Sequence, residues 1–316
     1  MGKLDRKRVV ITGASSGIGL SATREFAREG ADLALLARSQ EGLERAAAQA
    51  REHAATAHVI AVDLTDREAA ERAVAEAVDR LDGIDVLVTN AAASAYGSFR
   101  ALSADDFDRS MQATFNTAVY AIRAALDDLE SSRGVIVANV STAARTGIPD
   151  QSPYSAAKHA LRGFLNALRV ELKAERSPVR VAMVHPSPID TPFWRHATSA
   201  VGVQPKPLRS TYAPDVVAAA LVEAAVNPRP EVTVGSSGLI TNLLSTFARP
   251  LADLALSTYG VIAQRSDHPA TGPGAVHEAS GDGEETGGYG GRGSLTTALR
   301  LLRPDLLPLP GFRGRG

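Results

Sequence analysis

The sequence predicts an α/β fold in which helices cover both faces of a parallel sheet of about seven strands. Two observations lead to this prediction. Short apolar runs rich in β-branched residues alternate with longer segments of helical periodicity along residues 1–237. A glycine-rich turn joins the first of these strands to the first helix. Strands and helices that alternate in this way form a doubly wound sheet, which binds ligands at the carboxyl ends of its strands.

The composition of the chain argues against several classes of function. The chain has 316 residues, of which 44% are hydrophobic, and a formal net charge of −1, so neither nucleic acid nor an anionic surface is indicated as a partner. There is no cysteine, which excludes disulfides and thiol catalysis and leads us to expect a reducing, cytoplasmic location. The seven histidines are scattered, so we predict no metal. We find no signal-peptide core and no apolar run of membrane-spanning length.

The glycine-rich turn follows the apolar run over residues 9–11 and has the spacing Gly13-x-x-x-Gly17-x-Gly19. A helical pattern follows it and ends at Gly30. A strand, a glycine turn and a helix in this order present a helix N-terminus to a pyrophosphate, and glycine lets the backbone approach the phosphates. Tight turns also use glycine for steric reasons alone, so the turn by itself only favours nucleotide binding.

The remaining elements follow in regular order. After the first strand, apolar runs predict strands over residues 32–37, 58–62, 85–89, 134–140, 179–185 and 232–234. Helical periodicity predicts helices over residues 40–53, 65–81, 103–126, 152–175 and 214–226. Residues 65–68 and 103–106 have the form of helix caps, and Ser152-Pro153 is typical of a helix start.

Four segments depart from this alternation. Residues 187–212 contain recurrent prolines, Phe193 and the only tryptophan, Trp194, and we interpret them as a lid rather than a packed loop. Residues 238–264 form an amphipathic helical extension that we expect to dock on the body or on a second subunit, with peripheral membrane contact as an alternative. Residues 265–294 are glycine-rich and are predicted to be a disordered linker. The tail over 295–316 either docks as a short helix with a proline-broken segment or stays loose.

Tyr154 and Lys158 are four residues apart on one helix and therefore share a face. A nearby ammonium and the helix N-terminus both stabilise a phenolate, so we expect the pKa of Tyr154 to be lowered. Such a tyrosine can exchange a proton with an alcohol or alkoxide. Ser141 directly follows a strand at the ligand edge, where its hydroxyl can bond a substrate oxygen. Without Ser141, we would interpret Tyr154 and Lys158 as a polar pair on the surface of an amphipathic helix. Asn116 by itself would be interpreted as a structural polar residue.

Over residues 7–234 the chain resembles the short-chain dehydrogenase/reductase family. Residues 12–19 match the family's TGxxxGxG turn, residues 154–158 match its YxxxK motif, and Ser141 precedes the tyrosine by thirteen residues. The resemblance implies a Rossmann-like sheet in a single domain with a C-terminal extension. It also implies transfer of a hydride between a nicotinamide cofactor and a carbonyl or secondary alcohol, and a homodimer or homotetramer.

The same resemblance implies a role for each catalytic residue. Tyr154 would be the general acid/base, and Lys158 would bind the nicotinamide ribose and depress the tyrosine pKa. Ser141 would polarise the substrate oxygen, and Asn116 would anchor a water that relays protons. The cofactor would be bound by Gly13, Ser15, Ser16, Gly17, Ile18, Gly19, Arg38, Ser39, Asp63, Leu64, Asn90, Ala91, Tyr154, Lys158, Pro186, Ile189 and Thr191. Two positions depart from the family: Ala92 and Ser187 stand where glycine is usual.

Arg38 and Ser39 follow the second strand, where an NAD site commonly has a carboxylate. A guanidinium suits a 2′-phosphate, so we predict an NADP(H)-dependent oxidoreductase, with NAD(H) as the alternative cofactor. The apolar residues 189–194 point to a hydrophobic carbonyl or alcohol substrate. Two other functions stay open, an NAD-dependent alcohol dehydrogenase of the same family and a non-catalytic NADP(H)-binding scaffold or sensor.

Overall fold

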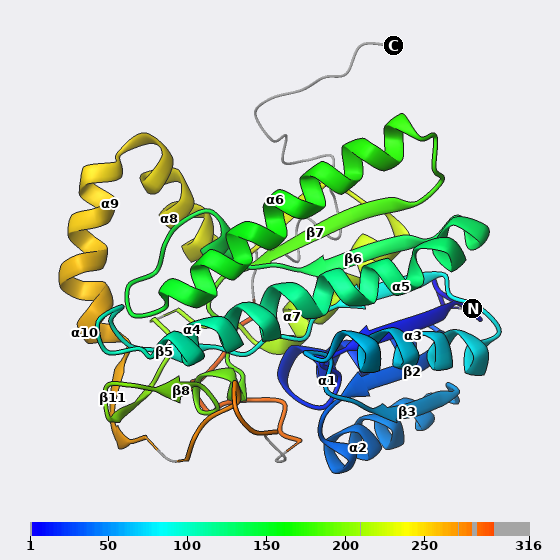
Figure 1. Ribbon diagram of the computed structural model, residues 1–316, viewed down its shortest axis with the longest axis horizontal. Coiled ribbons are helices and arrows are strands. Elements are labelled where there is room, and N and C mark those ends of the chain that lie inside the picture. Colours follow the sequence, from blue (N-terminus) through cyan, green and yellow to red (C-terminus); the bar gives the residue numbers. More distant parts are fainter. Residues whose placement is uncertain (1, 209, 271, 280–282, 294–316) are drawn as a thin grey trace.

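The computed structural model describes residues 2–208, 210–270, 272–279 and 283–293. Its centre is a seven-stranded sheet with the strand order β10-β7-β6-β4-β1-β2-β3 (Figure 1), in which every neighbouring pair is parallel. The strands are β1 (Arg8–Thr12), β2 (Asp32–Ala37), β3 (Ala57–Ala61), β4 (Val86–Thr89), β6 (Val135–Asn139), β7 (Arg180–Pro186) and β10 (Glu231–Val234). The predicted doubly wound α/β class is therefore confirmed.

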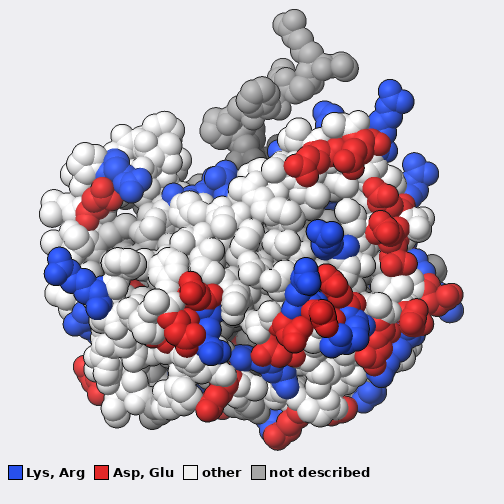
Figure 2. All heavy atoms as spheres, in the orientation of Figure 1, with Lys and Arg blue, Asp and Glu red and all other residues white. Residues whose placement is uncertain are grey.

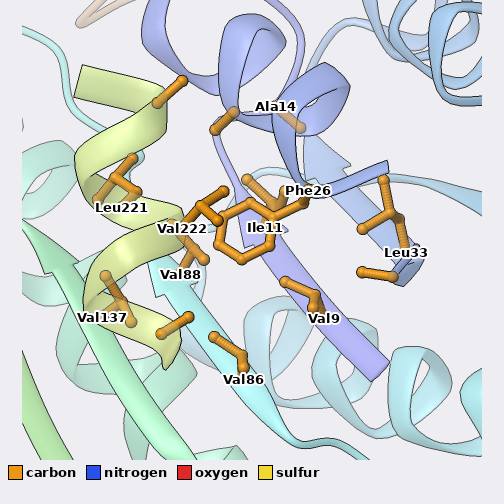
Figure 3. Packing of buried hydrophobic residues seen from close by; sticks show 14 of the residues in the cluster. Val9, Ile11, Ala14, Phe26, Leu33, Val86, Val88, Val137, Leu221 and Val222 are labelled. Carbon is orange, nitrogen blue, oxygen red and sulfur yellow. The ribbon is translucent and has the colours of Figure 1, made fainter. Parts of the chain in front are cut away.

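Helices cover the sheet on both faces, as the uninterrupted apolar strands predict. Successive side chains of a strand point to opposite faces, so Val9 and Ile11 of β1 pack with Phe26 in one core while Val10 belongs to the other (Figure 3). The first core is closed by α1 (Gly17–Arg28), α2 (Gln40–Arg51) and α7 (Pro214–Val226). The second core is closed by α3 (Arg67–Leu81), α5 (Thr117–Ser132) and α6 (Ser152–Ala174).

The helix predicted over residues 103–126 consists of α4 (Ala104–Met111), a π-helical turn (Gln112–Asn116) and α5. Its predicted cap is present, because Ser103 Oγ accepts from the Asp106 amide at 3.0 Å. In the π-turn, Thr114 Oγ1 donates to the carbonyl of Ala93 at 2.8 Å and ties the helix to the loop after β4. A π-turn inserts one residue without interrupting the helical pattern, so hydrophobic periodicity could not predict it.

The predicted lid, residues 187–212, is more regular than its prolines suggested. It contains a 3₁₀ turn (Pro192–Trp194) and two short strands, β8 (Thr198–Ser199) and β9 (Val203–Pro205). β8 pairs with β5 (Ala95–Tyr96), which follows β4, and β9 pairs with β11 (Arg265–Pro269) from the C-terminal extension. These pairings hold the segment beside the carboxyl ends of the strands.

The predicted amphipathic helix over residues 238–264 is divided at Ala248. It forms α8 (Ser236–Phe247), α9 (Arg249–Ala255), a π-turn (Leu256–Gly260) and α10 (Val261–Ala263), which lie together at one end of the sheet (Figure 1). α8 contacts the body through β10 and the turn after β6. The outer side chains are exposed and apolar: Ile240, Leu243, Leu244, Phe247, Leu251, Leu254, Tyr259 and Ile262. Among the described residues, no helix has the length and hydropathy required to cross a membrane.

The glycine-rich residues after β11 differ from the disordered linker predicted over 265–294. Residues 272–279 and 283–293, here called the glycine-rich strap, are hydrogen-bonded to the body at several points, including Arg292 N to the Thr211 carbonyl at 3.0 Å. Composition predicted disorder because these residues bury few side chains of their own. Their partners are instead backbone and charged groups of distant segments. The predicted tail over 295–316 lies outside the described residues.

Candidate active site

A cleft of about 260 Å³ lies at the carboxyl ends of the strands, near the point between β4 and β1 where the strand order reverses. Nucleotides bind at such reversal points in doubly wound sheets. Among the predicted site residues, only Gly19 and Asn116 do not line this cleft. The others do: Gly13, Ser15, Ser16, Gly17, Ile18, Arg38, Ser39, Asp63, Leu64, Asn90, Ala91, Ser141, Tyr154, Lys158, Pro186, Ile189 and Thr191.

The glycine turn is closely packed, which explains why glycine occupies its positions. A Cβ on Gly19 would lie 1.9 Å from the carbonyl oxygen of Gly13, so only glycine fits there without a shift. Gly13 has φ +67°, in the left-handed region that favours glycine. Asn90 holds this turn from β4, because its Nδ2 donates to the carbonyl of Gly13 at 3.0 Å. Gly19 therefore shapes the turn without lining the cleft.

The N-terminus of α1 lines the cleft through Ser16, Gly17 and Ile18. Ser16 is the N-cap residue, but its side chain makes no capping hydrogen bond. The Gly17 amide donates to the carbonyl of Glu284 in the glycine-rich strap at 2.9 Å. Amides at a helix N-terminus favour anions such as phosphate. The close-packed turn and these donors fit the pyrophosphate of a dinucleotide.

Arg38 lies at the end of the cleft formed after β2. Its Nη2 donates to the carbonyl of Ala275 in the glycine-rich strap at 2.6 Å. The neighbouring Ser39 caps α2, since its Oγ accepts from the Gly42 amide at 3.1 Å. Asp63, after β3, accepts from the Thr65 amide at 3.0 Å and so closes the next turn. This end of the cleft therefore presents a guanidinium where many NAD sites have a carboxylate.

Tyr154, Lys158 and Ser141 meet at the edge of the cleft, although they come from two elements. Tyr154 and Lys158 lie one turn apart on α6, and the Lys158 ammonium is 5.7 Å from the centre of the Tyr154 ring. The Ser141 side chain is close enough to the Tyr154 hydroxyl to act on the pKa of the phenol, which it lowers. Lys158 Nζ donates to the carbonyl of Asn139, the last residue of β6, at 2.8 Å. This constellation can bind a substrate oxygen and exchange a proton with it.

Burial controls the ionisation of both groups. The Lys158 side chain is 2% exposed, and burial lowers its pKa from 10.5 to about 7. Burial also raises the pKa of Tyr154 to about 12, although the Ser141 side chain acts in the opposite direction. The expected lowering of the tyrosine pKa is therefore wrong for this structure. The free-energy cost of removing water from the phenolate exceeds the stabilisation that the Lys158 ammonium provides. This ammonium lies over the ring and is itself easily deprotonated.

Ser141 is supported by a histidine behind it. A ring nitrogen of His185, on β7, lies 3.0 Å from the carbonyl oxygen of Ser141, and the side chain is fully buried. Burial lowers the pKa of His185, so it is neutral near pH 7. We conclude that this histidine positions the serine turn and does not reach the cleft.

Asn116 is the predicted catalytic residue that the structure does not bring into the cleft. It ends the π-turn, and its Nδ2 lies 3.4 Å from the hydroxyl of Tyr120 on the next helical turn. Ala113 and Thr117 from the same stretch do line the cleft. The role of Asn116 in holding a water near Lys158 stays a prediction.

Sequence reasoning missed the structural roles of several residues in and around the cleft. Gln264, from the C-terminal extension, lines the cleft and is hydrogen-bonded to Gln151 at the start of α6. Asp190 is 4% exposed and accepts three backbone amides of the glycine-rich strap. Ser187, which replaces the family's usual glycine, accepts from the Gly238 amide at 3.0 Å and fixes the start of α8. No local motif marks these residues, because their partners lie far away in the chain.

The lid contributes aromatic side chains. The ring centres of Phe193 and Tyr154 are 5.3 Å apart, and Trp194 Nε1 donates to the carbonyl of Ile189 at 3.1 Å. A second cavity, of about 260 Å³, adjoins this end of the cleft under the C-terminal extension. Both cavities share four lining residues: Thr142, Ile148, Pro188 and Leu208. No charged residue is found among the described residues that line the second cavity.

The fold and the cleft are those of an oxidoreductase that acts on alcohol or carbonyl groups with a nucleotide cofactor. A family profile described as short chain dehydrogenase matches residues 7–202, more than half of the chain. The chain therefore belongs to the short-chain dehydrogenase family, and the predicted resemblance is confirmed.

Relatives and solved structures agree with this assignment. The chain is 33% identical over 272 residues to uncharacterized oxidoreductase YxnA of Bacillus subtilis (strain 168), covering 85% of this chain and 76% of the relative. It is 35% identical to hydroxysteroid 11-beta-dehydrogenase 1-like protein B of Xenopus laevis, covering 72% and 77%. It is also similar to an alcohol dehydrogenase of Thermococcus sibiricus solved with 5-hydroxy-NADP, with 27% identity, a TM-score of 0.65 and coverage of 73% and 96%.

Proposed function

We propose that this chain is an NADP(H)-dependent oxidoreductase that interconverts a carbonyl and a secondary alcohol, with Tyr154 as the general acid/base. The observation that carries the proposal is the convergence of Tyr154, Ser141 and Lys158 on the lining of one cleft. A substrate oxygen bound by both hydroxyls would receive its proton from Tyr154 in reduction and return it in oxidation. The nicotinamide nucleotide supplies or accepts the hydride when it is bound.

Lys158 has a defined task in this scheme. When protonated, its ammonium stabilises the negative charge that develops on Tyr154 as the phenol releases its proton. Its pKa near 7 lets it gain or lose a proton under neutral conditions. The carbonyl of Asn139 keeps its Nζ in place. Lys158 thus makes the proton on Tyr154 available despite the burial of the phenol.

Arg38 supports the preference for NADP(H), because a guanidinium at this end of the cleft can bind a 2′-phosphate through two hydrogen bonds. The Thermococcus sibiricus relative was solved with an NADP derivative. We expect a lower KM for NADPH than for NADH, and Arg38→Asp should shift the ratio of the two kcat/KM values toward NADH by about 10- to 100-fold. Equal or lower KM values for NADH in the wild type would contradict the preference.

The substrate proposal is a hydrophobic carbonyl or alcohol. The Phe193 ring lies beside the Tyr154 ring, and the second cavity gives an apolar side chain or ring of the substrate a place next to the reacting hydroxyls. Two kinds of relative are named after apolar substrates. These are hydroxysteroid 11-beta-dehydrogenase 1-like protein and 3-ketodihydrosphingosine reductase, and the latter is 29% identical in Bos taurus. A panel of short and long ketones and alcohols, followed by nicotinamide absorbance with NADPH and NADH in parallel, tests this proposal.

The same panel separates the alternatives. Turnover of alcohols with NAD alone would replace the proposal by an NAD-dependent dehydrogenase of the same family. Tight nucleotide binding without turnover across the panel would favour a scaffold or sensor, which has no need of the Ser141–Tyr154–Lys158 arrangement. We further propose a homodimer or homotetramer through α5 and α6. The middle of the face that carries these helices bears few charged side chains (Figure 2).

A further inference from the structure

The glycine-rich strap runs across the cofactor side of the cleft and uses its hydrogen-bond donors. The Gly17 amide at the N-terminus of α1 donates to the carbonyl of Glu284 at 2.9 Å. At the other end, Arg38 Nη2 donates to the carbonyl of Ala275 at 2.6 Å. Ala275 and Ala279 themselves line the cleft. The strap therefore engages the two places that we assign to the pyrophosphate and the 2′-phosphate.

One end of the strap is anchored to a buried carboxylate. Asp190 accepts from the amides of Gly287 at 2.9 Å, Tyr289 at 2.8 Å and Gly291 at 2.8 Å. Glycine permits this close approach, since a Cβ on Gly287 would lie 2.5 Å from the carbonyl oxygen of Thr191. Hydrogen bonds to a buried charge are stronger than those between neutral groups. This anchor holds the strap beside the lid.

Two ion pairs hold the middle of the strap over the start of α1. Arg24 Nη1 and Nη2 donate to the two carboxylate oxygens of Glu285 at 2.6 and 2.8 Å. Glu284 forms an ion pair with Arg195 in the lid. Both carboxylates belong to the residue whose carbonyl accepts the Gly17 amide and to the residue after it, at the helix N-terminus that would receive phosphate groups. Phosphates and carboxylates repel one another, so they would not share this place.

We infer that the glycine-rich strap is an internal competitor of the cofactor, which binds only when the segment over Gly17 moves away. A backbone amide has one proton, so the Gly17 amide cannot donate fully to the Glu284 carbonyl and to a phosphate oxygen. The apparent cofactor affinity is then the intrinsic affinity reduced by the fraction of molecules in which the strap is open. This inference rests on the proposed function only in taking the cleft as a dinucleotide site.

The first test weakens the strap in the full-length protein. Glu285→Gln removes the charge that pairs with Arg24, and neither residue lines the cleft. The dissociation constants of NADPH and NADH, measured by nicotinamide fluorescence without substrate, should each fall by about 3- to 10-fold. Glu68→Gln is the matched control, since Glu68 pairs with Arg72 at 3.6 Å on the exposed face of α3. Unchanged or weaker binding in Glu285→Gln, with the control like the wild type, would overturn the inference.

The second test holds the strap closed. The chain has no cysteine, so Arg24→Cys with Glu285→Cys allows one specific cross-link by a reducible bis-maleimide reagent. The cross-linked protein should bind NADPH at least about 10-fold more weakly than after reduction of the linker. Equal binding before and after reduction would overturn the competition. Failure of every variant to bind either nucleotide would instead overturn the proposed cofactor, so the two failures are distinguishable.

Discussion

Tyr154 and Lys158 show how burial, more than charge proximity, sets the chemistry of two side chains. The pKa of the phenol is raised to about 12 and that of the ammonium is lowered to about 7, so both groups favour their neutral forms. A charged lysine helps the tyrosine to lose its proton only while it remains protonated in this buried place. The residue pair is identifiable from the sequence. The direction in which the tyrosine pKa shifts, however, depends on solvent exclusion by residues elsewhere in the chain.

The burial of Lys158 makes stability depend on pH. Between its folded pKa near 7 and its unfolded value of 10.5, the lysine is neutral when folded and protonated when unfolded. Unfolding therefore takes up a proton, and the free energy of unfolding rises with pH across this window. Relative to Lys158→Met, the wild type should gain on the order of 1–3 kcal/mol between about pH 7 and pH 9.

Urea titrations of the two proteins at several pH values measure this difference directly. Lys173→Met is the matched control, because Lys173 is an exposed lysine near the end of the same helix. It should follow the wild type at every pH. Parallel pH dependences of the wild type and Lys158→Met would mean that the buried lysine keeps its ordinary pKa.

At the scale of elements, the β1–α1 junction determines how closely a ligand can approach the sheet. Gly13 and Gly19 pack against each other and against Asn90, so the turn has no room for a Cβ at Gly19. The sequence pattern located this junction because the strand, the turn and the helix are contiguous in the chain. The π-turn before α5 was not predicted, and it is the reason why the position of Asn116 relative to the cleft could not be read from helical periodicity.

Gly19→Ala tests the packing of the turn. The new Cβ would lie 1.9 Å from a carbonyl oxygen, so the turn must open, with an expected loss of about 1–3 kcal/mol in unfolding free energy and weaker NADPH binding. Gly163→Ala is the matched control, because a Cβ on this α6 residue meets no atom within 4 Å. It should stabilise the protein by about 0.5–1 kcal/mol through helix propensity. Denaturant unfolding and nucleotide titration measure both effects. If Gly19→Ala matched this control in both measurements, the turn would tolerate a Cβ and the packing argument would be contradicted.

At the scale of the whole molecule, a parallel sheet brings residues from distant segments to one edge. The strands and most of the residues that line the cleft could be predicted, since each of these residues follows its own strand or lies on a contiguous motif. The glycine-rich strap could not, because its stability comes from partners such as Asp190, which lies 97 to 101 residues away from the amides it binds. Its composition indicates disorder when it is considered alone, and only the folded body supplies the carboxylate and arginines that hold it.

The C-terminal extension belongs to the same scale. α8 and the π-turn before α10 close the second cavity on one side, while the opposite side of the extension exposes apolar residues such as Phe247, which is 83% exposed. One element therefore contributes to the end of the cleft that we propose for the substrate and to the outer surface. Its amphipathic pattern was visible in the sequence, but the break at Ala248 was not.

The most direct test of the account is the Tyr154→Phe variant, assayed for turnover and for nucleotide binding in the same preparation. Phenylalanine keeps the ring and removes only the hydroxyl that would exchange the proton. We expect kcat/KM to fall by about 10²-fold or more on the best ketone of the panel, while the dissociation constant of NADPH stays within about twofold of the wild type. Turnover close to that of the wild type would contradict the assignment of Tyr154 as the proton donor.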